Sequence, residues 1–404
     1  MKKLIALLIV ISTLLLVSCG TEPVVTTDET TTANSEITVG IYAASFRHPA
    51  IEMKSRVLLA GQTGKLYYYS KADGESYPFC FNPLCQHTYQ ERCPSILFNH
   101  QYASQSQVYY NKFDNRVYAA RGQQIYSMSF DASDVRLECS LGERGKIEYS
   151  GFYASTDITE LKAYENYLFF MYNNEITGKT QIYRYDMNKR SLKEMTSATD
   201  EWVEWFMIAN GYIYVKSLNG DDSTGYTENY YTTDYDFENI HYVDTDIEPK
   251  VYDGEYFYII KNGEMIAFNP ITEEKKIIQT TIDSDAQPLI LAVQDGCAYY
   301  LPFSVPGKPG FEYSKVCRTS MTGETEMIFD LPGSMINGMN FVSDGVIMFL
   351  YSLNMTDANG NSLGADSMFF IHCDIAEDGK FVNPKPIGHK ADDEALVEFL
   401  SKFD

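Results

Sequence analysis

The chain has 404 residues, and its 55 acidic residues against 32 basic ones give a formal net charge of −23. Because nucleic acid and anionic bilayer surfaces would repel such a chain, this charge argues against both as partners. The 32 Tyr and 23 Phe favour a strand-rich protein, since aromatic side chains suit a pleated, half-buried surface.

Residues 1–18 are predicted to be a lipoprotein signal peptide. A basic start, Met1-Lys2-Lys3, precedes a mostly apolar run, and the small residue Ser18 stands directly before Cys19. This order is typical of a secretory signal, and the apolar run is too short for a permanent membrane span.

The four residues Leu16-Val17-Ser18-Cys19 resemble the bacterial lipobox. The resemblance implies that the Cys19 thiol carries a diacylglyceryl group, that the peptide is cut just before Cys19, and that the protein is held on the outer side of the cell membrane. Residues 19–40 follow as an expected disordered tether, because this Thr-rich and acidic stretch has almost nothing to bury.

Residues 41–388 carry a repeat in which a turn-forming pair precedes a short apolar, tyrosine-rich run. The seven pairs are Thr63-Gly64, Asp114-Asn115, Glu165-Asn166, Asn210-Gly211, Asp253-Gly254, Asp295-Gly296 and Asp344-Gly345. Their second residues are 42 to 51 positions apart, a period that fits four short strands per unit. A further run within the unit is interpreted as its second strand, as at Gln123–Tyr126, Thr180–Asp186, Gly263–Asn269 and Met368–Asp374.

A four-stranded sheet cannot bury both of its faces alone, so such units should stack around an axis. We therefore predict an all-β fold, a β-propeller of about seven four-stranded blades, with six or eight as alternatives. A pair of two-sheet sandwiches is the competing fold, but it would not need a regular period.

Four residues with metal-binding side chains lie close together near the end of the first unit: Cys80, Cys85, His87 and Cys93. Three thiolates and one imidazole form a tetrahedral set suited to structural zinc. A disulfide with one spare thiol is the alternative, because exported proteins meet oxidising conditions. Without Cys19, 7 of the 8 cysteines remain, so they cannot all pair within one chain. Cys139, Cys297, Cys317 and Cys373 are predicted to be small core residues.

The repeat and the cysteine segment together resemble the β-propeller lipoproteins of Gram-positive bacteria, in the style of the TolB-like and low-density-lipoprotein-receptor-like propellers. The resemblance covers roughly residues 37–388 and implies the propeller fold and the extracytoplasmic location. It also extends to the Cys-x4-Cys-x-His-x(n)-Cys stretch, which such lipoproteins often carry.

Two aromatic groups in the fourth unit are candidate ligand-binding residues. Trp202 and Trp205 alternate with carboxylates, and flat aromatic faces beside carboxylates suit a sugar ring, with packing in an inner strand as the plainer interpretation. Residues 219–239 are predicted to be an insertion, which is interpreted either as a solvated long hairpin or as a binding loop. Its tyrosines are Tyr226, Tyr230, Tyr231 and Tyr235.

The last residues, 389–404, change period. Leu396, Phe399, Leu400 and Phe403 recur at helical spacing behind an acidic first turn, which predicts one amphipathic helix.

The function predicted from the sequence is that of a membrane-anchored extracytoplasmic lipoprotein whose propeller binds an extracellular glycan, peptide or protein. No Gly-rich phosphate loop, His-Glu-x-x-His or Gly-x-Ser-x-Gly pattern is present, so no short motif supports catalysis. The alternative function is a carbohydrate-active enzyme, a glycosidase or lyase, with carboxylates on the propeller face.

The Cys19→Ala variant should be released from membranes, because the lipid on Cys19 is the predicted anchor. Membrane fractionation followed by a high-salt wash measures this. If the variant still sediments with membranes after the wash, the lipid-anchor prediction is wrong.

Overall fold

The computed structural model describes the strand-forming part of the chain, with gaps. The described residues are 50–52, 55–60, 66–86, 93–97, 108–111, 113–121, 123–141, 158–174, 179–195, 201–209, 211–221, 225–243, 251–252, 255–261, 264–279, 289–302, 314–320, 324–332, 334–352 and 368–387. The predicted signal peptide, tether and C-terminal helix lie outside them.

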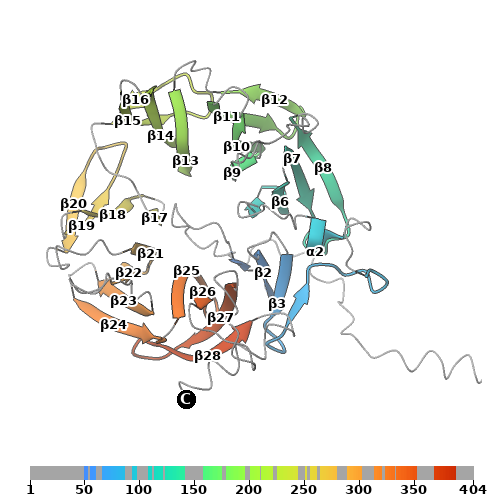
Figure 1. Cartoon of the computed structure of the whole chain (residues 1–404), viewed down its shortest axis with the longest axis vertical. Coiled ribbons are helices and arrows are strands. Elements are labelled where there is room, and N and C mark those ends of the chain that lie inside the picture. Colours follow the sequence, from blue (N-terminus) through green and yellow to red (C-terminus); the bar gives the residue numbers. More distant parts are fainter. Residues whose placement is uncertain are drawn as a thin grey trace, which may run out of the picture. The chain divides into compact units, whose positions relative to one another are not determined.

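The described residues form a β-propeller of seven four-stranded antiparallel sheets, numbered here as blades 1 to 7 in chain order (Figure 1). Each blade is one continuous part of the chain, and its strands are hydrogen-bonded in chain order from the first to the fourth. This confirms the predicted all-β class and the blade number of seven.

Blades 1 to 4 consist of β1 (Ala50–Glu52), β2 (Arg56–Ala60), β3 (Leu66–Ser70) and β4 (Ser76–Pro78); β5 (Val108–Asn111), β6 (Arg116–Arg121), β7 (Gln124–Met128) and β8 (Val135–Ser140); β9 (Ile158–Tyr164), β10 (Tyr167–Asn174), β11 (Lys179–Asp186) and β12 (Ser191–Glu194); and β13 (Glu201–Ala209), β14 (Tyr212–Asp221), β15 (Gly225–Thr233) and β16 (His241–Tyr242).

Blades 5 to 7 consist of β17 (Val251–Tyr252), β18 (Phe257–Lys261), β19 (Glu264–Phe268) and β20 (Lys275–Gln279); β21 (Leu289–Gln294), β22 (Cys297–Leu301), β23 (Lys315–Ser320) and β24 (Thr325–Asp330); and β25 (Ser334–Val342), β26 (Gly345–Ser352), β27 (Met368–Ile375) and β28 (Phe381–Ile387). The one helix among the described residues is α2 (Pro94–Leu97), and none there has the length and hydropathy to cross a bilayer.

The predicted positions of the turn pairs and strand runs within the blades need two corrections. Five of the turn pairs stand between the first and second strands of a blade, and the pair Asp344-Gly345 ends on the first residue of β26, but Thr63-Gly64 falls between β2 and β3 in the sequence. The runs interpreted as second strands are the third strands β7, β11, β19 and β27. Blade 1 was misplaced because its first strand, β1, has only three residues and gives little signal.

The hydrophobic core lies between neighbouring blades, and β26 shows how a strand serves two of these layers. Val346, Ile347, Met348, Phe349 and Leu350 are all buried. The even-numbered residues pack with blade 6, and the odd-numbered ones pack with blade 1. Both faces of the strand are covered, so its sequence is continuously apolar although neighbouring side chains point in opposite directions.

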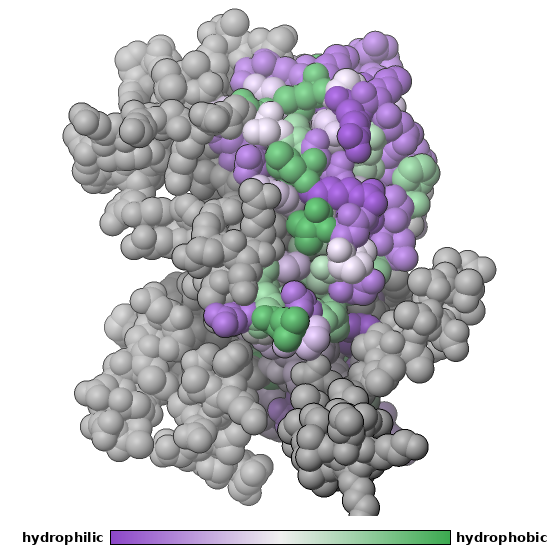
Figure 2. Space-filling model, turned by 90° about the vertical axis from the view of Figure 1, so that its right-hand side faces the viewer, coloured by the Kyte–Doolittle hydropathy of each residue, from purple (hydrophilic) through white to green (hydrophobic). Residues whose placement is uncertain are grey.

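The fourth strands form the outer edges, as β20 does for blade 5 in Figure 1. All residues of β12 are exposed, and the strand ends with the charged pair Lys193 and Glu194. On the face shown in Figure 2, hydrophobic residues form small areas separated by hydrophilic ones. Charged edge residues oppose pairing with a strand of another chain.

Blades 1 and 7 meet at an interface, which we call the seam, and side-chain contacts hold it together. Among the described residues no strand of one blade pairs with a strand of the other. Glu52 of β1 accepts a hydrogen bond from Lys71 and another, of 2.8 Å, from the backbone N–H of Ser343. Lys71 also donates to the Ser343 hydroxyl at 2.6 Å and lies 3.3 Å from the Asp344 carboxylate.

A second contact at the seam joins two rings. Tyr69 of β3 stacks on His372 of β27 with a centroid separation of 5.6 Å, and the imidazole is 4% exposed. Its Nε2 lies 3.6 Å from Asp344, and its Nδ1 lies 3.9 Å from Asp374. Burial and these two aspartates raise the pKa of Tyr69, so its hydroxyl stays protonated at neutral pH.

The Lys71→Met variant should lower the free energy of unfolding by about 3 kcal/mol, because it leaves the buried Glu52 carboxylate without its cation. Denaturant unfolding measures this. The matched control is Lys380→Met, which breaks the exposed pair of Lys380 and Asp378 and should cost about 0–1 kcal/mol. Equal losses in the two variants would contradict a special role for the seam.

Candidate functional site

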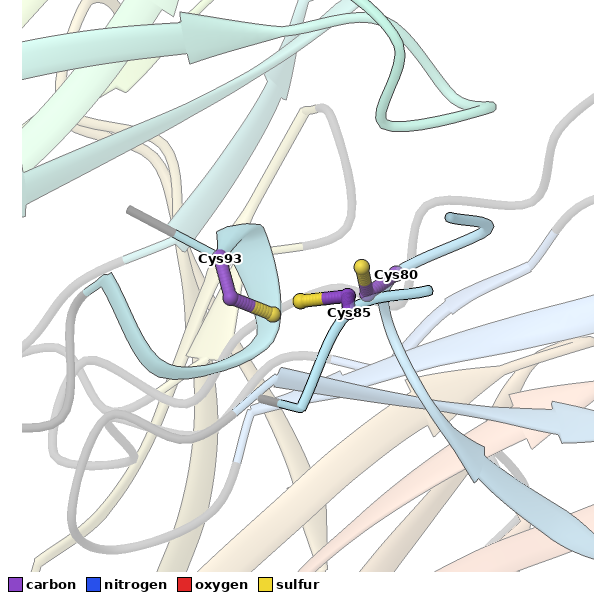
Figure 3. Close-up of side chains that lie close together, drawn as sticks. All are labelled: Cys80, Cys85 and Cys93. Atoms are coloured by element: carbon purple, nitrogen blue, oxygen red, sulfur yellow. The ribbon is translucent and has the colours of Figure 1, made fainter. Parts of the chain in front are cut away.

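The cysteine cluster, defined as Cys80, Cys85 and Cys93, lies in the connection between blades 1 and 2. Cys80 and Cys85 follow β4, and Cys93 directly precedes α2. The Sγ atoms of the three residues all lie within 4.8 Å of one another. In Figure 3 the thiols of Cys85 and Cys93 point toward each other, with that of Cys80 beside them.

The cluster is partly removed from water. Cys93 is buried, whereas Cys80 and Cys85 are half-buried. Burial, together with hydrogen bonds to the other two thiols, raises the pKa of Cys93 to about 12, although the backbone N–H of Ser95 opposes this. Without a cation, the thiolate form of Cys93 is therefore disfavoured at neutral pH.

This arrangement could bind a metal ion. Among the described residues it is the one group of three or more His, Cys, Asp or Glu side chains close enough to do so. The structure thus brings together three of the four predicted ligands. His87 lies outside the described residues, so its role as the fourth ligand stays a prediction.

The remaining described cysteines are dispersed over β8, β22, β23 and β27. Cys139 and Cys373 are buried, and half-buried Cys297 and Cys317 pack against core clusters. Burial raises the pKa of Cys373 and Cys139, the latter to about 11, as is typical of unreactive core thiols.

The predicted insertion in blade 4 is mainly strand. Residues 212–221 and 225–233 form one long hairpin, β14–β15, which is longer than the five-residue strands β18 and β19 of blade 5. The interpretation as a long hairpin is therefore confirmed for β14–β15, and ligand binding by its tyrosines stays a prediction. The physical reason is the pairing along the whole length of both strands, from Ile213 with Thr233 to Asp221 with Gly225.

A β-bulge places both tryptophans on the same face of blade 4. Trp202 is paired with Leu218 and Trp205 with Lys216, and the register shifts at Glu204 between them. Without this extra residue, positions three apart on a strand would point to opposite faces. The register adds Tyr226 and Tyr230 to this face, through their partners Gly220 and Lys216.

The part of this face near the start of β14 and the end of β15 is packed against blade 5. Tyr230 is 4% exposed and belongs to a core cluster with Tyr214 and Phe257, against which the half-buried Trp205 also packs. These rings are in contact with protein along the blade interface. The prediction that Tyr230 and Trp205 bind a ligand stays a prediction.

The part of the same face nearer the turn of the β14–β15 hairpin is solvent-exposed. We call this part the aromatic platform, and its residues are Trp202, Leu218, Tyr226, Glu204 and Glu228. Trp202 is 44% and Tyr226 48% exposed. Glu228 lies in the same cross-strand row as Leu218 and Trp202. Gly220 stands opposite Tyr226 and has no side chain, which leaves a gap in the middle strand beside that ring.

Lys216 fixes the two glutamates of the platform. Its side chain is 6% exposed, and its Nζ lies 2.5 Å from Glu204 and 3.4 Å from Glu228. The ammonium also lies 5.9 Å from the centre of the Tyr230 ring. The carboxylates are thereby held in place, while 42% of Glu204 and 53% of Glu228 remain exposed. Lys216 was not predicted from the sequence, where its signal is a lone charge within an apolar run.

The other two predicted tyrosines lie elsewhere. Tyr231 is 2% exposed on the opposite face of blade 4, in the cluster shared with blade 3. Tyr235 is half-buried in the turn after β15, where its hydroxyl donates to the Ala209 carbonyl at 2.8 Å and accepts from the Gly211 N–H at 3.0 Å. Its ring lies 4.3 Å from that of Tyr164 in blade 3. The ligand-binding role predicted for both stays a prediction.

Comparisons with known proteins show similarity in fold. No model of a protein family matches the chain, and no curated protein matches its sequence. An oligogalacturonate lyase from Vibrio parahaemolyticus superposes with a TM-score of 0.54 at 10% identity, over 85% of this chain and 93% of that one. The β-propeller domain of the Trilobed protease from Pyrococcus furiosus has a TM-score of 0.48 at 10% identity, over 89% of this chain and 98% of that one.

At such low identity these similarities show the fold alone. This chain is a seven-bladed β-propeller. Its site residues must therefore be judged by their own chemistry.

The Trp205→Phe variant should keep the free energy of unfolding within about 1 kcal/mol. The indole Nε1 is buried without a hydrogen-bond partner among the described residues, so the phenyl ring keeps the packing on Tyr214 and removes that donor. Trp205→Ala should lower stability by about 3 kcal/mol, because it also removes the ring. Denaturant unfolding of both variants measures the difference, and equal losses would contradict this account of Trp205.

Proposed function

We propose that this protein is a lipid-anchored extracytoplasmic binding protein, and that its aromatic platform captures an extracellular glycan. The signal peptide and Cys19 motif of the sequence support the anchor and the location. The exposed rings of Trp202 and Tyr226, on one face with two carboxylates, support the ligand.

The chemistry of the platform suits a sugar. A pyranose ring has an apolar face that can stack on an aromatic ring, and its edge carries hydroxyl donors. Trp202 and Tyr226 supply the stacking surfaces, and Glu204 and Glu228 supply acceptors. Because Lys216 already holds both carboxylates, little side-chain entropy is lost when a hydroxyl binds.

A binding role is preferred to the alternative of a carbohydrate-active enzyme. The lyase of similar fold is named for oligogalacturonate, a chain of acidic sugars. The net charge of −23 on the present protein opposes a polyanion of that kind. The charge therefore favours a neutral glycan, and the lack of a short catalytic motif in the sequence favours binding over cleavage.

The cysteine cluster has a structural role in this proposal. It holds the connection between blades 1 and 2, either as a zinc site or through one disulfide.

The Trp202→Ala and Tyr226→Ala variants should each weaken glycan binding by about 10-fold, because each removes one stacking surface worth about 1–1.5 kcal/mol. A glycan array identifies the ligand, and calorimetry measures the affinities. The melting temperature should stay unchanged, since both rings are exposed.

Tyr242→Ala is the matched control, because Tyr242 is 63% exposed on the same blade but pairs with Tyr231 of the opposite face. It should bind the glycan as the unmodified protein does. Equal glycan affinity of all three variants would contradict a binding site on the aromatic platform. Shortening of a polysaccharide by the protein would favour the alternative function of a carbohydrate-active enzyme.

A further inference from the structure

The two halves of the cysteine cluster are tied to the same backbone carbonyl. The oxygen of Leu66, the first residue of β3, accepts a 3.0 Å hydrogen bond from the Phe79 N–H, next to Cys80. It also accepts a 2.8 Å hydrogen bond from the hydroxyl of Ser95, two residues after Cys93. Cys80 and Cys93, which are 13 positions apart in the sequence, are thus both positioned from one carbonyl of blade 1, which brings their thiols together.

The segment that carries Cys80 and Cys85 is fixed in two further ways. Phe81 stacks on Tyr68 of β3 at 5.1 Å, and the Arg56 guanidinium lies 4.9 Å from the centre of the Phe81 ring. A turn at Asn82 then presents Cys85, whose N–H donates to the Asn82 carbonyl at 3.0 Å, while the Asn82 side chain accepts from Leu84. The thiols are therefore held by packing and hydrogen bonds before any ligand arrives.

The spacing of the thiols fits one tetrahedral ion. Zinc–sulfur bonds of about 2.3 Å place two thiolates about 3.8 Å apart. Since all three Sγ atoms lie within 4.8 Å of one another, each pair needs to close by at most about 1 Å, as small side-chain rotations allow. A disulfide would join two sulfurs at about 2.05 Å and leave the third beside it without use.

We propose that Cys80, Cys85 and Cys93 together bind one zinc ion as thiolates, and that this ion fastens the connection between β4 and β5 to blade 1. The proposal is independent of the glycan-binding function. The three thiols release three protons when Zn²⁺ binds, so the three thiolates and the ion together carry one net negative charge, and one further donor completes the tetrahedral coordination.

Elemental analysis of the purified exported protein should find one zinc ion per chain. Removal of the ion by a chelator should lower the melting temperature, and added Zn²⁺ should restore it. Mg²⁺ should not, because it prefers oxygen ligands. Exchange with Co²⁺ should give the charge-transfer absorption of a thiolate complex.

The Cys80→Ser and Cys93→Ser variants should bind zinc at least roughly 10–100-fold more weakly, since even the loss of an outer-shell partner has an effect of that size. Cys297→Ser is the matched control, because Cys297 is half-buried like Cys80 but lies in β22; it should keep its zinc. If buried Cys93→Ser does not fold, Cys80→Ser still decides the test.

Three results would overturn the proposal. One is a disulfide between any two of the three cysteines, found by mass spectrometry of unreduced peptides. Another is unchanged zinc content in both cluster variants. The third is a protein that takes up no zinc when its thiols are reduced and the metal is supplied.

Discussion

Lys71 bridges the place where the ring must close, and the position of every blade depends on that closure. The sheets do not exchange strands among the described residues, so backbone hydrogen bonds stabilise each blade but not the ring. Glu52, Lys71 and Ser343 supply directional bonds across the seam, while a shared apolar cluster supplies the burial. Desolvation offsets much of the attraction of a charge pair buried in this way, whereas removal of one partner leaves the other charge buried and unpaired.

The aromatic platform depends on the same packing between blades. The buried part of the same face of blade 4 packs on blade 5, where the ring centroids of Tyr214 and Phe257 are 5.0 Å apart. Only the part of the hairpin that extends past this contact is exposed. The same strands thus give a rigid base and an exposed end, and Lys216 lies at the boundary between them. Rigid positioning of aromatic rings lowers the entropy cost of binding.

The fold could be predicted from the sequence because turn pairs and apolar runs repeat at nearly constant spacing, which is a local signal. The site could be predicted only in part. Cys80, Cys85 and Cys93 are near in sequence, and their convergence was foreseen. The bulge at Glu204 leaves no comparable signal in the sequence, so the common face of Trp202 and Trp205 could not be predicted. Nor could composition distinguish exposed Tyr226 from buried Tyr230, since that difference is set by how far blade 5 covers the hairpin.

The continuity of each blade along the chain has an evolutionary consequence. When the last blade of a ring borrows a strand from the other end of the chain, a change in blade number must preserve that shared sheet. Here a single duplication or deletion of one contiguous segment adds or removes a complete sheet and leaves every other sheet intact. The new neighbours then need to match only in their side-chain layers. Such a chain can change its circumference, and with it the number of blades around the axis, by whole units of gene sequence.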